Sequence, residues 1–205
     1  MNEQFFDRAS KADYDAWGVL GNPGWSWEDL LPYFIKSTNL TVPPPANPYH
    51  YTWNSSFYGR TGPVRANFAP FQWPEEYVFW DAWHEIAAQQ QQKSLAQIEF
   101  PKEGGSGDAV GVYWVPNSQD DATQTRSDAR TAYYDPAAER PNLHLVTGTK
   151  VNKILLCGKT AVGVQMTARD AKPDQHVSIA ARKEVILAAG PVFSPNLLHL
   201  SLIHI

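Results

Sequence analysis

The feature that most constrains the fold is the apolar run at residues 185–189, Val-Ile-Leu-Ala-Ala, which Gly190 and Pro191 close. Five apolar residues without polar alternation are typical of a strand that is buried on both faces of a layered α/β sheet. Runs of β-branched and aliphatic residues bounded by Gly, Pro or Asp precede it and also predict strands, at residues 143–146, 151–156, 161–166 and 177–180. The last third of the chain should therefore hold most of the sheet.

A turn and a helix should follow the buried run. Ser194 is a favourable N-cap and Pro195 suits the first helical position, so we expect the helix to begin there. Backbone N–H groups at such a helix start can bind an anion such as a diphosphate. Strand–glycine–helix turns are also common where no ligand binds, so this geometry alone leaves both interpretations open.

Earlier in the chain, local signals predict further elements. Ser26 followed by two acidic residues indicates a capped helix start. Further elements are expected as a strand after the turn at residues 59–64, a helix at 77–90, a strand at 111–116 and a helix at 125–134. The glycine-rich residues 104–107 lack the Lys-Ser/Thr of a phosphate loop and are interpreted as a flexible linker. A carbohydrate platform could be formed by Trp17, Trp25, Trp27, Leu31 and Phe34, but aromatic packing around the turn at residues 21–24 is favoured.

Composition narrows the class of protein. The 205 residues suit one or two domains, and a net charge of −4 gives no basic footprint for nucleic acid. No apolar run approaches the ~20 residues that cross a membrane. Cys157 is the single cysteine, which excludes an intramolecular disulfide or a cysteine metal cluster, and we expect it to be a buried, inert thiol. Sequons at Asn39 and Asn54 permit glycosylation and tilt the expected localisation towards secretion.

Three segments resemble the glucose–methanol–choline (GMC) oxidoreductases. Residues 190–201 resemble the second signature of this family, and residues 140–190 resemble the segment before it. The first fifteen residues resemble the end of the first signature, at Met1, Asn2, Phe6, Ala9 and Asp15. The resemblance implies an α+β fold, in which residues 1–70 and 126–205 belong to an FAD-binding domain and residues 71–125 to an antiparallel substrate domain.

The resemblance also implies which residues line the cofactor FAD. Asn2 and Phe5 match positions beside the isoalloxazine ring, Val151 matches a residue whose backbone contacts adenine, and Ala189 and Gly190 match a strand end close to the flavin. For each of these residues the alternative is an ordinary core or turn position. No catalytic or metal-binding residue is expected here, because the histidine base of the family lies downstream of the last matching residue.

Both ends depart from the family pattern. The first strand and the Gly-x-Gly-x-x-Gly turn that receives the FAD diphosphate would precede Met1, and Leu202 stands where the family continues Gly-Ile-Gly. We therefore expect an internal fragment that is inactive in isolation, with residues 202–205 as an exposed or disordered foreign end.

The activity expected of the whole protein is hydride transfer from a small-molecule alcohol to flavin, as in fungal aryl-alcohol or glucose oxidases. Two alternatives stay open. One is a flavin-containing hydroxynitrile lyase of the same fold, and the other is a non-catalytic secreted binding protein built on the aromatic surface.

Overall fold

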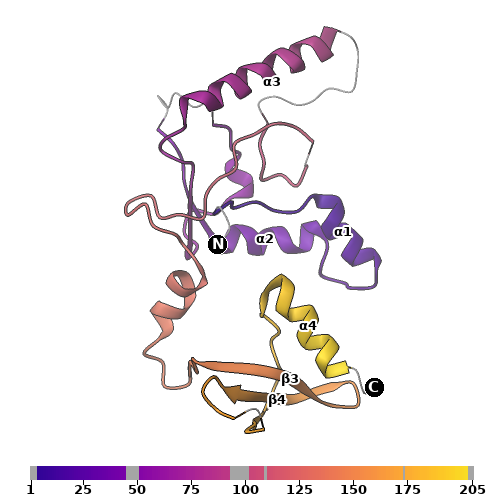
Figure 1. Cartoon of the computed structure of the whole chain (residues 1–205). Coiled ribbons are helices and arrows are strands. Elements are labelled where there is room, and N and C mark those ends of the chain that lie inside the picture. Colours follow the sequence, from indigo (N-terminus) through magenta and orange to yellow (C-terminus); the bar gives the residue numbers. More distant parts are fainter. Residues whose placement is uncertain (1–3, 45–50, 93–101, 109, 173, 203–205) are drawn as a thin grey trace. The chain divides into compact units, whose positions relative to one another are not determined.

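The computed structural model describes residues 4–44, 51–92, 102–108, 110–172 and 174–202. Asn2 and residues 203–205, which the sequence analysis singled out, lie outside these ranges. The chain divides into two compact units, Met1–Arg140 and Pro141–Ile205, and each is described by itself (Figure 1). Both combine helices with small sheets, which confirms the mixed α+β class.

The first unit begins with two capped helices, α1 (Lys11–Val19) and α2 (Trp27–Ser37), which pack on each other. Ser26 caps α2 through a capping box with Asp29, which confirms the predicted start. The same arrangement of a serine and an aspartate begins α1. Acidic residues in the first turn of each helix also complement its macrodipole.

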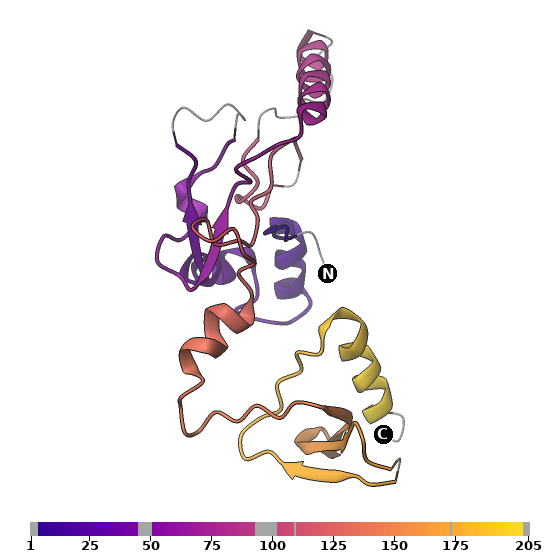
Figure 2. The same ribbon diagram turned by 60° about the vertical axis from the view of Figure 1, so that its left-hand side comes forward.

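A short parallel pair of strands carries the core of the first unit. β1 (Thr38–Thr41) pairs in parallel with β2 (Val64–Asn67), and Figure 2 shows the two strands side by side. The 3-10 turn η1 (Ser55–Phe57) lies between them in the sequence. Buried aromatic and aliphatic side chains gather around this pair: Leu40, Tyr51, Tyr58, Ala66 and Phe68. The strand expected after residues 59–64 is thus confirmed.

The helix expected at residues 77–90 is present as α3 (Pro74–Gln92), which projects from the rest of its unit in both views (Figures 1 and 2). Trp80 stacks on Trp114 with ring centroids 5.1 Å apart. The prediction of a strand at residues 111–116 is wrong. Val112 and Pro116 accept hydrogen bonds from Lys102 and Phe6, so the segment exchanges single bonds with separate loops rather than joining one ladder.

The glycine-rich loop is not the flexible linker that its composition suggested. The N–H of Gly105 donates to Glu103 Oε1 at 2.6 Å, and the carbonyl of Gly107 accepts from Lys11 N–H at 2.6 Å. A Cβ added at Gly104 would come within 2.3 Å of the Tyr113 ring. The glycines therefore permit close packing of this loop.

Residues 125–134 do not form one regular helix. Helical structure begins later, in the π-helical turn η2 (Arg130–Tyr134) and the 3-10 turn η3 (Asp135–Ala137). Before them, Ser127 N–H bonds to the carbonyl of Ser118 at 3.0 Å, which holds this stretch extended. Asp128 then accepts from the N–H of Thr131 and caps the turn.

The second unit contains an antiparallel three-stranded sheet in the order β3-β4-β5. Its strands are β3 (Thr149–Cys157), β4 (Thr160–Ala168) and β5 (Val177–Ala180), which confirms three of the predicted strands. Residues 143–146 form no strand. The helix α4 (Gly190–Leu202) contacts β3. Cys157, expected to be buried, is exposed because it ends β3 at the hairpin turn.

The apolar run at residues 185–189 is not the buried strand that its pattern predicts. It pairs with no strand in the described part of the chain, and Ile186 is 78% exposed. A strand needs a hydrogen-bonded neighbour, and the three-stranded sheet does not supply one here. The helix after it begins at Gly190 rather than after Ser194, and Pro195 lies inside it. Pro191 takes a place in the first turn, where its missing N–H has no intrahelical partner to lose.

Candidate functional site

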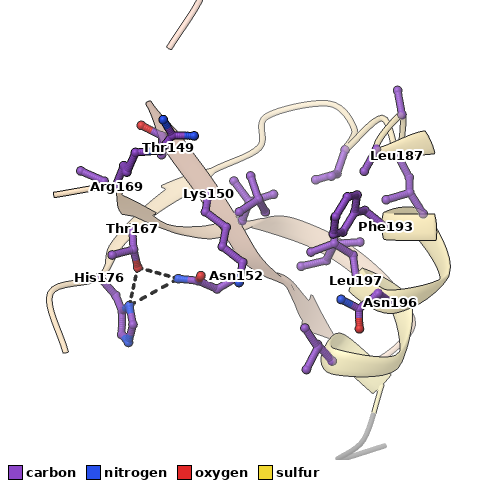
Figure 3. A pocket seen from close by; sticks show the side chains of 18 of the residues that line it. Thr149, Lys150, Asn152, Thr167, Arg169, His176, Leu187, Phe193, Asn196 and Leu197 are labelled. Atoms are coloured by element: carbon purple, nitrogen blue, oxygen red, sulfur yellow. Dashed lines mark hydrogen bonds between the residues drawn. The ribbon is translucent and has the colours of Figure 1, made fainter. Parts of the chain in front are cut away.

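A cavity of about 1090 Å³ lies in the second unit, between the β3–β4 hairpin, residues 185–189 and α4. Its lining has two chemically distinct parts (Figure 3). Leu187, Phe193 and Leu197 lie together in one part, and polar side chains occupy the other. Such a combination of an apolar wall and a few placed polar groups is typical of a small-molecule site.

The polar part is organised by a hydrogen-bonded cluster of Asn152, Thr167 and His176 (Figure 3). Asn152 Nδ2 donates to Thr167 Oγ1 at 2.6 Å and lies 3.4 Å from His176 Nδ1. Thr167 Oγ1 lies 2.8 Å from the same ring nitrogen. Lys150 and Arg169 line the cavity beside the cluster and add positive charge.

The orientation of the β3 backbone follows from the ladder. In β4, the carbonyl of Val162 accepts from Ala181 beyond β5, so even-numbered residues of this strand direct their backbone groups towards β5. Met166 is even-numbered and lies opposite Val151. The backbone N–H and C=O of Val151 therefore point away from β4, on the edge of β3 that has no strand neighbour within the described sheet. Val151 lines the cavity and is 36% exposed.

A bulge changes this alternation one residue later. Pairing shifts between Val151 and Lys153, which makes Asn152 the extra residue. As a result Ile154 also points its backbone groups outward, and its N–H donates to Ser201 Oγ in α4 at 2.8 Å. The Ser201 hydroxyl in turn donates to the carbonyl of Leu197 at 2.5 Å. The outer edge of β3 thus holds α4 at one position and leaves the Val151 pair facing the cavity.

Of the residues predicted to line a cofactor, Val151 and Ala189 meet in this cavity. Gly190 begins α4 with φ +83°, and a Cβ built there would meet nothing within 4 Å. Conformation, rather than lack of space, therefore favours glycine at this position. Phe5 belongs to the first unit, where it is 65% exposed and pairs with Asn117. Asn2 is outside the described residues.

Sequence reasoning missed the Asn152, Thr167 and His176 cluster and assigned no role to the Ser201 side chain. The cluster members are 15 and 9 residues apart in the chain, and only the strand register brings them together. A bulge has no signature in strand-forming residues such as these. The weak signal was the polar pair Asn152 and Lys153, which interrupts the apolar residues of this strand.

A second polar cluster, in the first unit, is structural in character. The Arg8 guanidinium lies over the rings of Phe34 and Tyr58, with centroid distances of 5.2 and 5.0 Å, and donates to the carbonyl of Gly105. Burial lowers the pKa of Arg8 and raises the pKa of Glu103 and of Tyr58. Within the described ranges no group of three or more His, Cys, Asp or Glu side chains could hold a metal ion. No described helix is long and apolar enough to span a membrane.

Comparison with known proteins places this geometry in a family. The family model for GMC oxidoreductases matches residues 1–204. The dehydrogenase xptC of Emericella nidulans is 37% identical over 98% of this chain, which covers 31% of that protein. Oxygen-dependent choline dehydrogenase of Brucella anthropi is 32% identical over 98% of this chain, which covers 32% of that protein. The chain thus spans about a third of the length of these relatives.

Solved structures of two oxidoreductases superpose closely on this chain. An FAD-dependent oxidoreductase from Chaetomium thermophilum superposes with a TM-score of 0.84 at 39% identity, and a fungal aryl-alcohol oxidase with 0.81 at 31%. Each match covers 98% of this chain and 33% of the other. The family match over nearly the whole sequence and the close superposition lead to one conclusion: the chain belongs to the GMC oxidoreductases, a family whose cofactor is FAD.

Proposed function

We propose that the second unit supplies the adenine-binding part of the FAD site in an alcohol oxidoreductase. The observation that carries the proposal is the outward-facing N–H and C=O of Val151 at the cavity. Adenine carries its N6 amino donor next to a ring-nitrogen acceptor, which complements a backbone C=O and N–H of one residue. Backbone recognition of this kind does not depend on the side chain, so valine suits the position.

The remaining lining residues have roles that fit the same ligand. Ala189 is small and leaves room beside Val151, while Phe193 and Leu197 offer the ligand an apolar surface. Gly190 turns the chain into α4. By the family resemblance, Asn2 and Phe5 of the first unit would lie beside the isoalloxazine ring. When bound, FAD supplies the hydride acceptor for oxidation of CH–OH groups.

The complete activity is proposed from the relatives. These include dehydrogenases and an aryl-alcohol oxidase, which favours a small-molecule alcohol as substrate. We propose further that the 205-residue chain does not oxidise alcohols by itself, because none of its histidines matches the catalytic base of the family. Anaerobic mixing of the FAD-supplemented chain with aryl and aliphatic alcohols should leave the flavin absorbance unbleached.

The alternatives have less support. The relatives named above are oxidases and dehydrogenases, which favours redox chemistry over a lyase. A carbohydrate platform needs exposed flat rings that share one plane. Trp27 is 2% exposed, and the exposed rings of Trp17 and Trp25 meet edge to face at 61°. For the complete protein we propose an FAD-binding part that includes residues 1–70 and 126–205 and a substrate part that includes residues 71–125. We also propose that the complete protein is secreted.

Calorimetric titration with FAD, ADP and FMN tests the adenine site. FAD and ADP should bind the wild-type chain, and FMN should bind at least tenfold more weakly because it lacks adenine. The Val151→Pro variant removes the outward N–H without breaking a bond to β4, since proline is tolerated at such edge positions. Loss of one hydrogen bond should raise the dissociation constant about three- to tenfold.

The matched control is Ser178→Pro. Ser178 lies in β5, opposite odd-numbered Gln165, so its N–H also points out of the sheet but at the other edge. Its affinity for FAD and ADP should equal that of the wild-type chain. Equal affinities for Val151→Pro and Ser178→Pro, or FMN binding as tight as FAD binding, would contradict the proposed site.

A further inference from the structure

We propose that Asn152, Thr167 and His176 are positioning residues that hold the bulge of β3 and so keep α4 bonded to this strand beside the outward-facing Val151 backbone. This deepens the proposed adenine site and rests on it for the identity of the ligand. The bulge itself belongs to the fold of the second unit and is present without a ligand. The two parts can therefore be tested separately.

The bulge lets β3 serve two partners along one edge. In a regular strand, backbone groups alternate, so residues facing the same way are two or four positions apart. Val151 and Ile154 are three apart, yet both face outward, because Asn152 is inserted between the two registers. If the pairing of residues 149–151 continued without the shift, Ile154 would lie opposite Gly163 and direct its N–H to β4. The bond to Ser201 would then be lost.

The side-chain cluster is placed to prevent that slip. Asn152 is the inserted residue, Thr167 lies on β4, and His176 immediately precedes β5. Bonds of 2.6 and 2.8 Å join the three side chains across the width of the sheet (Figure 3). A bulged residue has no partner directly opposite it, so its side chain is the group that can fix its position.

The same slip would disturb the cavity. Ser201 holds α4 to β3 through Ile154, and α4 supplies Phe193 and Leu197 to the apolar wall. If the Ile154 N–H turned towards β4, its bond to Ser201 would break, close to the outward N–H and C=O of Val151. The cluster therefore acts on ligand binding through the geometry of β3 and does not itself need to touch the ligand.

Amide exchange measured by NMR on the full 205-residue chain tests the cluster without any ligand. In Thr167→Val, which keeps the β-branched shape but removes the hydroxyl, the Ile154 amide should exchange about three- to tenfold faster than in the wild-type chain. Thr167→Ser, which restores a hydroxyl, should return the wild-type rate. The control is Thr160→Val, the same change at the other end of β4, outside the cavity, and it should leave the Ile154 rate unchanged.

Titration with ADP then tests the link to binding. Thr167→Val should weaken ADP binding by a similar factor, whereas Thr160→Val should not. An Ile154 exchange rate that is the same in Thr167→Val and Thr160→Val would overturn the proposal whether or not the chain binds ADP. Faster exchange of the Ile154 amide with unchanged ADP affinity would overturn the proposed effect of the cluster on ligand binding. A wild-type chain that binds neither ADP nor FAD would refute the adenine site, while the exchange data would still decide the role of the cluster.

Discussion

Ser201 Oγ accepts the backbone N–H of Ile154 at 2.8 Å and so joins the last described turn of α4 to the edge of β3. The two residues are 47 positions apart in the chain. Because Ser201 also donates to the carbonyl of Leu197, one hydroxyl both satisfies a strand N–H and closes a helical turn. A single side chain therefore links the two elements that enclose the cavity.

Ser201→Ala should destabilise the second unit by about 1–3 kcal/mol, because it leaves the half-buried Ile154 N–H without an acceptor. Urea unfolding followed by a probe in the second unit measures this free energy. The control is Ser194→Ala, the same substitution nearer the start of α4. It should lower the free energy of unfolding by less than about 0.5 kcal/mol. Equal losses in the two variants would mean that helix propensity, rather than the bond to Ile154, decides the stability.

The sequence predicted best where local rules determine the structure. The β3–β4–β5 strands, α3 and the Ser26 cap follow from alternation, spacing and capping, which act over a few residues. The run at residues 185–189 was predicted wrongly because burial depends on neighbours that local sequence does not specify. Its extended residues remain beside the cavity, with Ile186 78% exposed.

The candidate site, too, could be predicted only in part. Val151 and Ala189 were selected by resemblance, and both line the cavity. The bulge at Asn152, which turns the Ile154 backbone to the same edge as that of Val151, was not predictable, because one-residue shifts in register leave composition unchanged. The glycines at 104–107 were misread for a related reason: composition cannot distinguish a glycine that gives freedom from one that permits contact.

Gly163→Ala should open the contact between β4 and β5. A Cβ at this position would lie 2.3 Å from the carbonyl oxygen of Ile179 and 3.2 Å from Ala180 Cα, and both are backbone atoms that cannot rotate away. Overpacking of this kind typically costs about 1–3 kcal/mol. Gly18→Ala is the control, since its Cβ would meet Ser26 at an ordinary 3.8 Å. Thermal unfolding should show a lower midpoint for the first variant, and a midpoint equal to that of Gly18→Ala would contradict the contact.

Acid should weaken the loop that Lys102 and Asp108 close. The side chain of Lys102 is 3% exposed and its Nζ lies 2.7 Å from Asp108 Oδ2. This hydrogen bond holds the pKa of the Asp108 carboxyl below its usual value. A depressed folded-state pKa contributes stability above the ordinary value of about 4, and that stability is lost as the pH falls through the folded-state pKa.

The corresponding variant is Asp108→Asn. It should be less stable than the wild-type chain at pH 7, and the difference should shrink as the pH falls below about 4, because the wild-type carboxyl then becomes neutral too. Urea midpoints at pH 7 and pH 3 measure both differences. Asp170→Asn, in an exposed turn of the second unit, is the control for the substitution itself. A deficit of Asp108→Asn that stays constant with pH would show that the carboxylate charge is not responsible.

The two sequons should differ if the protein enters a secretory pathway. Asn54 is exposed, and its side chain only caps the short turn η1 by accepting from Ser56 N–H at 2.9 Å, so a glycan can extend into solvent. Asn39 lies in β1, where its amide bridges the carbonyl of Arg60 and the guanidinium of Arg65 at 3.0 Å each. A glycan is attached through the Asn39 amide nitrogen, which is the atom that faces the Arg60 carbonyl, so it would disturb that contact beside the fully buried Thr38.

Protein recovered in folded form from a secretory host should therefore carry a glycan at Asn54 and none at Asn39. Mass spectrometry after glycosidase treatment locates the modification, because the released asparagine becomes aspartate. Asn54→Gln should abolish the mass shift and affect only the cap of the short turn η1, whereas Asn39→Gln should leave the glycan in place and destabilise the β1–β2 pair. The longer side chain cannot keep both bonds, and each is worth about 1 kcal/mol. A glycan on Asn39 in folded protein would contradict the observed packing of β1 against β2.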